Sequence, residues 1–360
     1  MKLGLELTRS QEDRAQALHQ KAIFVNACDS TPVEEANDEY FDGLLKTGIT
    51  AVNSTLYAYP EKRPDPLTEV LDATAKWYDI LKKSTSAVHV RRAEDIEKAK
   101  SASKIAVVFG TQNADFIYDP SFVKVFGVLG IKIMQLTYQN RNLIGDGCGE
   151  KKPGGLSKFG VQVVEEMNRS GIVIDLSHTS RPTSLDAIEV SRDPVIYSHS
   201  SVHKIVPAIR NRTDEEIKAL AEKGGVIGLI PKSNWIRPDG LSTGTTIADY
   251  LTHVGHVVAL VGVNHAGIGL DIGNGRPHGR YGIDDPFFAQ QYPELSGPGA
   301  ISPAWKAGYS IENIHPLGLS PPFPQVLNIT RGLVALGYSD QDITKILGEN
   351  FMRVFGKVWK

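Results

Sequence analysis

Residues 213–230 read TDEEIKALAEKGGVIGLI, a capped helix followed at once by a short apolar strand. Thr213 and Glu216 have the spacing of a capping box, in which each side chain accepts a hydrogen bond from the other residue's backbone. Gly224 is typical of the residue that ends a helix. The run 225–230 is apolar at consecutive positions, which indicates a strand covered on both faces, as in a parallel sheet.

The same alternation continues along the chain, and Ser157, for example, is placed to cap a helical pattern over 159–168. Eight strands that alternate with helices predict a (β/α)8 barrel of the TIM type, with a doubly wound open sheet as the alternative. The apolar runs, rich in β-branched residues and ended by polar residues or glycine, are 22–25, 48–53, 105–109, 131–136, 171–176, 194–197, 225–230 and 267–270.

The composition excludes several classes of protein. With 41% hydrophobic residues the chain can build a core, so it is not intrinsically disordered. A net charge of −2 over 360 residues excludes a strongly basic nucleic-acid binder, and two cysteines exclude a disulfide scaffold. The N-terminal residues lack the apolar run of a signal peptide, so we expect none, and no apolar stretch reaches the roughly 18 residues of a membrane span. We expect one barrel domain over residues 1–360, with no nucleic-acid or membrane partner, located in the cytoplasm.

Two segments depart from the alternating pattern. Residues 273–319 are rich in glycine, proline and aromatic residues and have few regular patterns. Because loops this long inside a compact domain are usually functional, we expect either a lid over the pocket or a dimer contact. Residues 339–355, SDQDITKILGENFMRVF, predict a capped amphipathic helix that is interrupted near Gly348.

Barrel active sites gather at the carboxyl ends of the strands. The polar residues found there are Cys28, Asp29 and Ser30 after the first run, Gln112 and Asn113 after the third, Tyr138, Asn140 and Arg141 after the fourth, His178 after the fifth, His199 and then Arg210 after the sixth, and Asp271 after the eighth.

Two histidines at equivalent strand ends, His178 and His199, each follow a serine and predict a metal site; a structural hydrogen-bonding pair is the alternative. Asp271 is a candidate general base, and Arg210 can grip a carboxylate through two N–H groups. The simpler interpretations are a helix-capping aspartate and a surface arginine.

Several stretches closely resemble the membrane (renal-type) dipeptidases, peptidase family M19 of the amidohydrolase superfamily. The resemblance runs in order from about residue 22 to the C-terminus. It implies a (β/α)8 barrel of the metal-dependent hydrolase type, a two-zinc site bridged by a glutamate, hydrolysis of dipeptides, and a homodimer. The matching stretches are GGLSKFGVQVVEEMNRSGIVIDLSHTS (154–180), YSHSS (197–201), RNRTDEEIKALAEKGGVIGL (210–229), GIGLDIGNG (267–275) and GLVALGYSDQDITKILGENFMRVF (332–355).

The resemblance assigns roles to single residues. His178 and His199 match the histidines that bind the second zinc ion, Arg210 matches the arginine that holds the substrate carboxylate, and Asp271 matches the aspartate that deprotonates the bridging water. Asn140 and Arg141 are further candidates for substrate binding.

Four positions differ from the family pattern. Cys28 and Ser30 stand where the family has the His-x-Asp motif that ligates the first zinc ion, and Gln112 stands where it has the bridging glutamate. Tyr138 replaces a substrate-polarising histidine and is a candidate donor to the oxyanion. Neutral replacements compensate the charge of two cations poorly, so the complete two-zinc site of the family is disfavoured, and we expect one or two zinc ions.

If a single ion is bound at the histidines, its third ligand is open: Cys28, Asp29, Gln112 and Asp271 are the candidates. Cys28 has other interpretations, as a buried core residue, a catalytic thiol, or the partner of Cys148 in a disulfide.

The leading hypothesis is a metal-dependent hydrolase that cleaves a small amide or dipeptide-like substrate bearing a free carboxylate. The first alternative is a non-peptidase enzyme on the same barrel, namely a lyase, an isomerase or a ring-opening hydrolase with one metal ion or none. The second is an inactive binding protein. The metal content of the purified chain separates the three.

Overall fold

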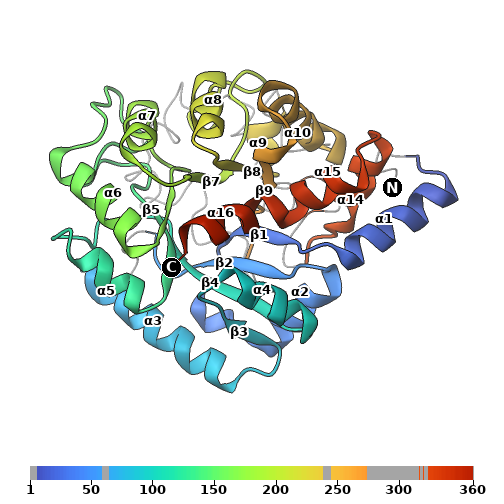
Figure 1. Ribbon diagram of the computed structural model, residues 1–360, viewed down its shortest axis with the longest axis horizontal. Coiled ribbons are helices and arrows are strands. Elements are labelled where there is room, and N and C mark those ends of the chain that lie inside the picture. The colour runs from blue at the N-terminus through green and yellow to red at the C-terminus, as the bar shows by residue number, and fades with distance from the viewer. Residues whose placement is uncertain are drawn as a thin grey trace, which may run out of the picture.

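The strands form a single parallel sheet that curls into a barrel (Figure 1). The computed structural model describes residues 6–58, 65–237, 245–273, 316, 319 and 323–359. Eight strands follow one another in the order β1-β2-β4-β5-β6-β7-β8-β9, and β3 pairs with β4 outside this path. The strands are β1 (Val25–Asp29), β2 (Ala51–Thr55), β3 (Ala87–His89), β4 (Ile105–Thr111), β5 (Ile131–Gln135), β6 (Val173–Asp175), β7 (Ile196–Ser200), β8 (Val226–Leu229) and β9 (Ala266–Ile268).

Backbone hydrogen bonds close the ring between the last strand and the first. The Asp271 N–H group donates to the carbonyl of Cys28 over 3.0 Å, and the Ser30 N–H group donates to the carbonyl of Ile272 over 2.9 Å. Asp29 and Ile272 form a parallel bridge at the same place. The (β/α)8 barrel predicted from the sequence is therefore confirmed, and the open sheet is excluded.

Each predicted apolar run contributes to one strand of the ring, but two details differ. The first strand begins at Val25, because its polar residues are themselves buried and Asn26 Oδ1 accepts from the N–H groups of Cys28 and Leu270. The short strand β3 was not predicted, since it has only three residues and its central Val88 is exposed.

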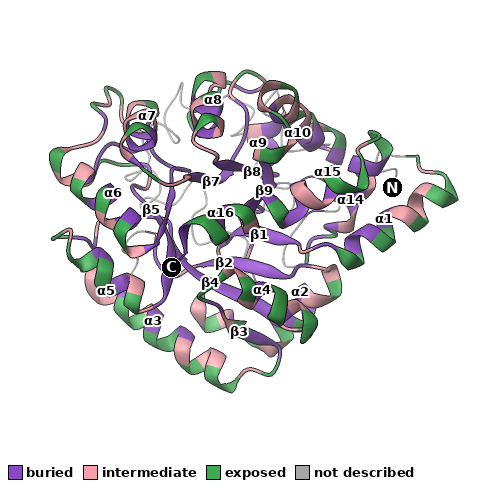
Figure 2. Cartoon of the chain, viewed as in Figure 1, coloured by how far each residue is buried: buried purple, intermediate pink, exposed green. Residues whose placement is uncertain are grey.

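Helices surround the barrel, with their apolar sides toward the strands and their outer sides exposed (Figure 2). Two predicted helix starts are present: Ser157 accepts from Gly160 N, and Thr213 and Glu216 form the capping box. The helices are α1 (Arg9–Lys21), α2 (Asp38–Thr47), α3 (Pro66–Lys83), α4 (Ala93–Ser101), α5 (Phe122–Val128), α6 (Lys158–Ser170), α7 (Arg181–Val190), α8 (Asp214–Glu222), α9 (Ser233–Ile236), α10 (Ile247–Val261), α14 (Leu327–Ala335), α15 (Asp340–Thr344) and α16 (Asn350–Val358).

The C-terminal segment covers the amino-terminal end of the barrel. Ser339 caps α15, a π-helical turn (Lys345–Glu349) contains Gly348, and α16 follows. A Cβ atom at Gly348 would lie 2.2 Å from the carbonyl oxygen of Ile23, so the close approach to β1 needs glycine. In Figure 1, α16 crosses the middle of the ring. Its buried face packs on the strands' inward-facing residues. The polar candidate residues follow the carboxyl ends of the strands and so lie at the opposite, uncovered end of the barrel.

Most of the predicted loop over 273–319 lies outside the described residues, so neither the lid nor the dimer contact is tested. Within the described ranges, none of the helices has both the length and the apolarity needed to cross a bilayer.

Candidate functional site

Two histidines face each other at the carboxyl ends of β6 and β7. The Nε2 atoms of His178 and His199 lie 3.0 Å apart, and both side chains are buried. Burial lowers the pKa of His199 to about 3 and the pKa of His178 well below its usual range. Both rings are therefore neutral near pH 7, which is the form that can bind a metal ion.

A relay behind His199 fixes which of its nitrogens carries the proton. The hydroxyl of Ser198 donates to the carboxylate of Asp175, and His199 Nδ1 lies 2.7 Å from the same hydroxyl oxygen. Because the Ser198 proton is already committed, His199 Nδ1–H must be the donor in that contact. The lone pair of His199 Nε2 then points toward His178, as in metal sites where an outer hydrogen bond orients the ligating imidazole.

Asp271 lies beside the histidines with both of its carboxylate oxygens engaged. Its Oδ1 accepts from the Ser30 hydroxyl over 2.6 Å and lies 3.6 Å from the Cys28 thiol. Its Oδ2 lies 2.8 Å from the ammonium nitrogen of Lys232. The φ of Asp271 is +48°, a left-handed conformation that is uncommon for residues other than glycine and is often found at functional sites. Asp271 is therefore held beside the histidines by its side-chain contacts and is not a helix cap.

Cys28 is a neutral thiol in this environment. Burial, together with the nearby Asp271 carboxylate, raises the pKa of the thiol well above its usual range. Its sulfur lies 3.4 Å from Gln112 Nε2, which also donates to the Thr55 hydroxyl over 2.9 Å. A reactive thiolate requires the opposite surroundings. Neither cysteine forms a disulfide, so the pairing of Cys28 with Cys148 is absent.

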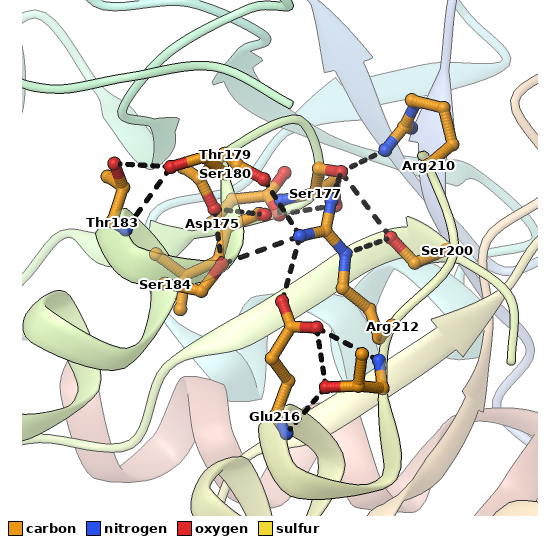
Figure 3. A network of polar contacts seen from close by, with 12 residues as sticks. Asp175, Ser177, Thr179, Ser180, Thr183, Ser184, Ser200, Arg210, Arg212 and Glu216 are labelled. Atoms are coloured by element: carbon orange, nitrogen blue, oxygen red, sulfur yellow. Dashed lines mark hydrogen bonds and ion pairs between the residues drawn. The ribbon is translucent and has the colours of Figure 1, made fainter. Parts of the chain in front are cut away.

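Arg210 is buried, and it contacts the backbone at His199 and at Ser177, the residue before His178. Its guanidinium donates to the carbonyl of Ser177 (Figure 3). It also donates to the carbonyl of His199 over 3.2 Å. It also lies 5.2 Å from the ring centre of Trp235. With only 2% of its surface exposed, Arg210 is not the surface residue of the simpler interpretation. Within the described part of the chain, its Nε atom has no hydrogen-bond partner.

The neighbouring Arg212 has a structural role. It also donates to the Ser177 carbonyl, and its guanidinium lies 3.2 Å from the buried carboxylate of Glu216 (Figure 3). Since Arg212 is neutralised by this ion pair, Arg210 is the better candidate for an incoming anion.

Tyr138 lies against the site from β5, where its ring stacks on His178 at 4.0 Å between ring centres. Burial raises the pKa of its phenol, so Tyr138 is a hydrogen-bond donor and not a phenolate.

Three candidate residues lie elsewhere. Asn140 and Arg141 are exposed, and Arg141 is ion-paired with Asp146. The Asp29 carboxylate accepts from the Tyr40 hydroxyl over 2.5 Å, and burial raises its pKa to about 6. Because alternate residues of a strand face opposite sides, Asp29 points away from Cys28 and toward α2.

The donor atoms fit one metal ion better than two. His178 and His199 present two buried Nε2 atoms to one point. Possible ligand atoms of Cys28, His199 and Asp271 also lie within 4.8 Å of one another, but there the carboxylate already pairs with Lys232.

The sequence analysis missed Lys232 and Trp235, which follow strand β8 in the stretch IPKSNW (230–235). The residues that follow the run 225–230 were left out of the prediction. The same rule that selected His178 and His199, applied to every strand, includes Lys232.

Comparison with known proteins identifies the family of the chain. The sequence model of "Membrane dipeptidase (Peptidase family M19)" matches residues 12–296. The chain is 28% identical over 270 residues to dipeptidase tcpJ of Claviceps purpurea, covering 74% of this chain and 54% of that protein. It is 30% identical over 270 residues to an uncharacterized dipeptidase of Schizosaccharomyces pombe, covering 73% of this chain and 60% of the relative. The chain thus spans little more than half the length of these curated relatives.

The solved structure of an amidohydrolase from Pseudomonas aeruginosa superimposes with a TM-score of 0.80 at 30% identity, covering 96% of this chain and 99% of that one. The family match extends over most of the chain, and the fold is shared over nearly its whole length. The chain therefore belongs to the membrane dipeptidase family, peptidase family M19.

Proposed function

We propose that this protein is a metal-dependent hydrolase that cleaves a small, dipeptide-like amide with a free carboxylate, using one zinc ion held by His178 and His199. The observation that carries the proposal is the 3.0 Å approach of two buried, neutral Nε2 atoms, one of them oriented by the Ser198–Asp175 relay. The names of the curated relatives, both dipeptidases, support an amide substrate. The homodimer and the cytoplasmic location stay predictions.

Arg210 would bind the substrate carboxylate. A buried guanidinium is costly unless an anion joins it, and the Arg210 Nε–H group, which has no hydrogen-bond partner among the described residues, offers a charge-assisted hydrogen bond. Burial lowers the pKa of Arg210, yet an arginine keeps its charge at any physiological pH. The Ser177 and His199 carbonyls fix the guanidinium, so the carboxylate would be anchored at a set distance from the two histidines.

A divalent cation held by His178 and His199 would supply Lewis acidity, which would polarise the amide carbonyl and increase the acidity of water at the site. The chain's own residues would transfer the proton and donate a hydrogen bond to the oxyanion. Asp271, ion-paired with Lys232, would take the proton of the attacking water and pass it to the leaving amine. Tyr138, whose phenol keeps its proton, would donate a hydrogen bond to the oxyanion.

The test compares Arg210→Lys with the wild type on matched substrates, one with a free carboxylate and one with a carboxamide. Lysine keeps the charge and loses the planar, multi-donor geometry, so we expect kcat/KM for the carboxylate substrate to fall at least tenfold, about 1.4 kcal/mol. The carboxamide should be poor for both enzymes. Arg181→Lys, at an exposed ion pair with Glu215, is the control. Equal losses on both substrates would show that Arg210 is structural only.

A further inference from the structure

We propose that the ammonium group of Lys232 occupies a cation position beside Cys28 and Asp271, which together form one half of the site (the Cys28–Asp271 half). The chain then holds at most one metal ion, at the histidines. The inference concerns the site of the proposed function and rests on that assignment of His178 and His199.

The geometry places Lys232 where a cation would sit. Its Nζ lies 2.8 Å from Asp271 Oδ2, and both side chains are about nine-tenths buried, with 10% and 11% of their surfaces exposed. The ring of Trp235 lies 5.9 Å from the same ammonium nitrogen, at the distance of a cation–π contact. Lys232 is therefore held on two sides, by a carboxylate and by an aromatic ring.

The charges of the side chains in the Cys28–Asp271 half balance without a metal ion. Asp271 contributes one negative charge and Lys232 one positive charge, while the side chains of Ser30 and Gln112 beside them are neutral. A divalent ion added here would lie beside the Lys232 ammonium in a buried site and would have to share the Asp271 carboxylate with it, which is strongly unfavourable.

The distances between donors alone do not explain the exclusion. The ligand atoms of Cys28, His199 and Asp271 lie within 4.8 Å of one another, close enough to surround an ion. Lys232 repels a second cation from this set and uses the carboxylate that the ion would need. Removing its charge should therefore open the Cys28–Asp271 half to metal.

The experiment titrates metal-free protein with Co²⁺ and follows bound metal by elemental analysis and thiolate ligation by sulfur-to-cobalt charge-transfer absorption. We compare the wild type with Lys232→Met, Lys232→Arg, and Lys232→Met combined with Cys28→Ser. Lys232→Arg keeps the positive charge and controls for replacing the side chain. Circular dichroism and thermal unfolding verify that each variant is folded.

We expect one ion per chain and no charge-transfer band in the wild type and in Lys232→Arg. Lys232→Met should bind one further ion and gain the band, and the added Cys28→Ser change should abolish it. Two ions in the wild type, or no extra ion in a folded Lys232→Met, would overturn the proposal. A wild type that binds no ion would contradict the proposed function instead, while a gain of metal in Lys232→Met would still support the role of Lys232.

Discussion

The Ser198 hydroxyl is the only group between His199 and the buried Asp175 carboxylate in the described site, so replacing it tests how the metal ligand is oriented. In Ser198→Ala, His199 Nδ1–H loses its acceptor at 2.7 Å, and Asp175 loses one of its donors. Removal of such an outer partner typically weakens metal binding about 10- to 100-fold. Since each factor of ten is about 1.4 kcal/mol, we expect a loss of about 1.4 to 2.8 kcal/mol in zinc binding.

Ser200→Ala is a matched control on the same strand. Ser200 is equally buried, but its hydroxyl makes only longer contacts, 3.4 Å from Arg212 Nε and 3.5 Å from the Ser177 carbonyl oxygen. It does not touch either histidine ring among the described contacts. We therefore expect its zinc affinity to stay within about threefold of the wild type, well below the effect of losing an outer partner.

The assay is a zinc competition titration against a chromophoric chelator at pH 7.5, with urea unfolding of the metal-free proteins alongside. The unfolding experiment separates a general loss of stability, expected because the buried Asp175 keeps fewer donors, from a loss of metal affinity. The reasoning fails if Ser198→Ala binds zinc as tightly as Ser200→Ala.

Two further predictions concern pH and substrate range. His253 is buried, accepts from Val202 N at 3.0 Å and lies 2.9 Å from the Ile236 carbonyl; burial lowers its pKa from 6.5 to about 4. As the pH falls, His253 takes up a proton in the unfolded chain before it does so in the folded one, so this residue should lower the free energy of unfolding by about 3 kcal/mol between pH 6.5 and pH 4. In His253→Gln, the free energy of unfolding measured in urea should therefore depend less steeply on pH. An unchanged slope would refute this prediction. With one ion, ordinary dipeptides assayed with added zinc should stay below a kcat/KM of about 10⁴ M⁻¹s⁻¹, and faster turnover would argue for a second ion.

The barrel could be predicted because parallel strands buried on both faces give continuous apolar runs that helical patterns separate. Strand β3 lacked that signal, with an exposed Val88 between two other residues. The histidines could be found because the carboxyl ends of barrel strands meet, whatever their distance in the sequence.

Contacts between distant segments could not be predicted. Nothing near Lys232 in the sequence shows that it pairs with Asp271, which lies on another strand end. The neighbours Cys28 and Asp29 look equivalent as ligands, and only the strand's alternation places one toward Asp271 and the other toward Tyr40. Arg141 follows a strand, yet its loop pairs it with Asp146 instead.

The metal content of the wild type and His178→Ala, purified together without chelators, tests most directly whether the histidines hold a metal ion. If His178 and His199 share one zinc ion through their facing Nε2 atoms, the wild type should carry about one ion per chain. His178→Ala should carry almost none, while thermal unfolding shows that it is still folded. Equal metal contents in the two proteins would contradict the assignment of the metal to the histidine pair.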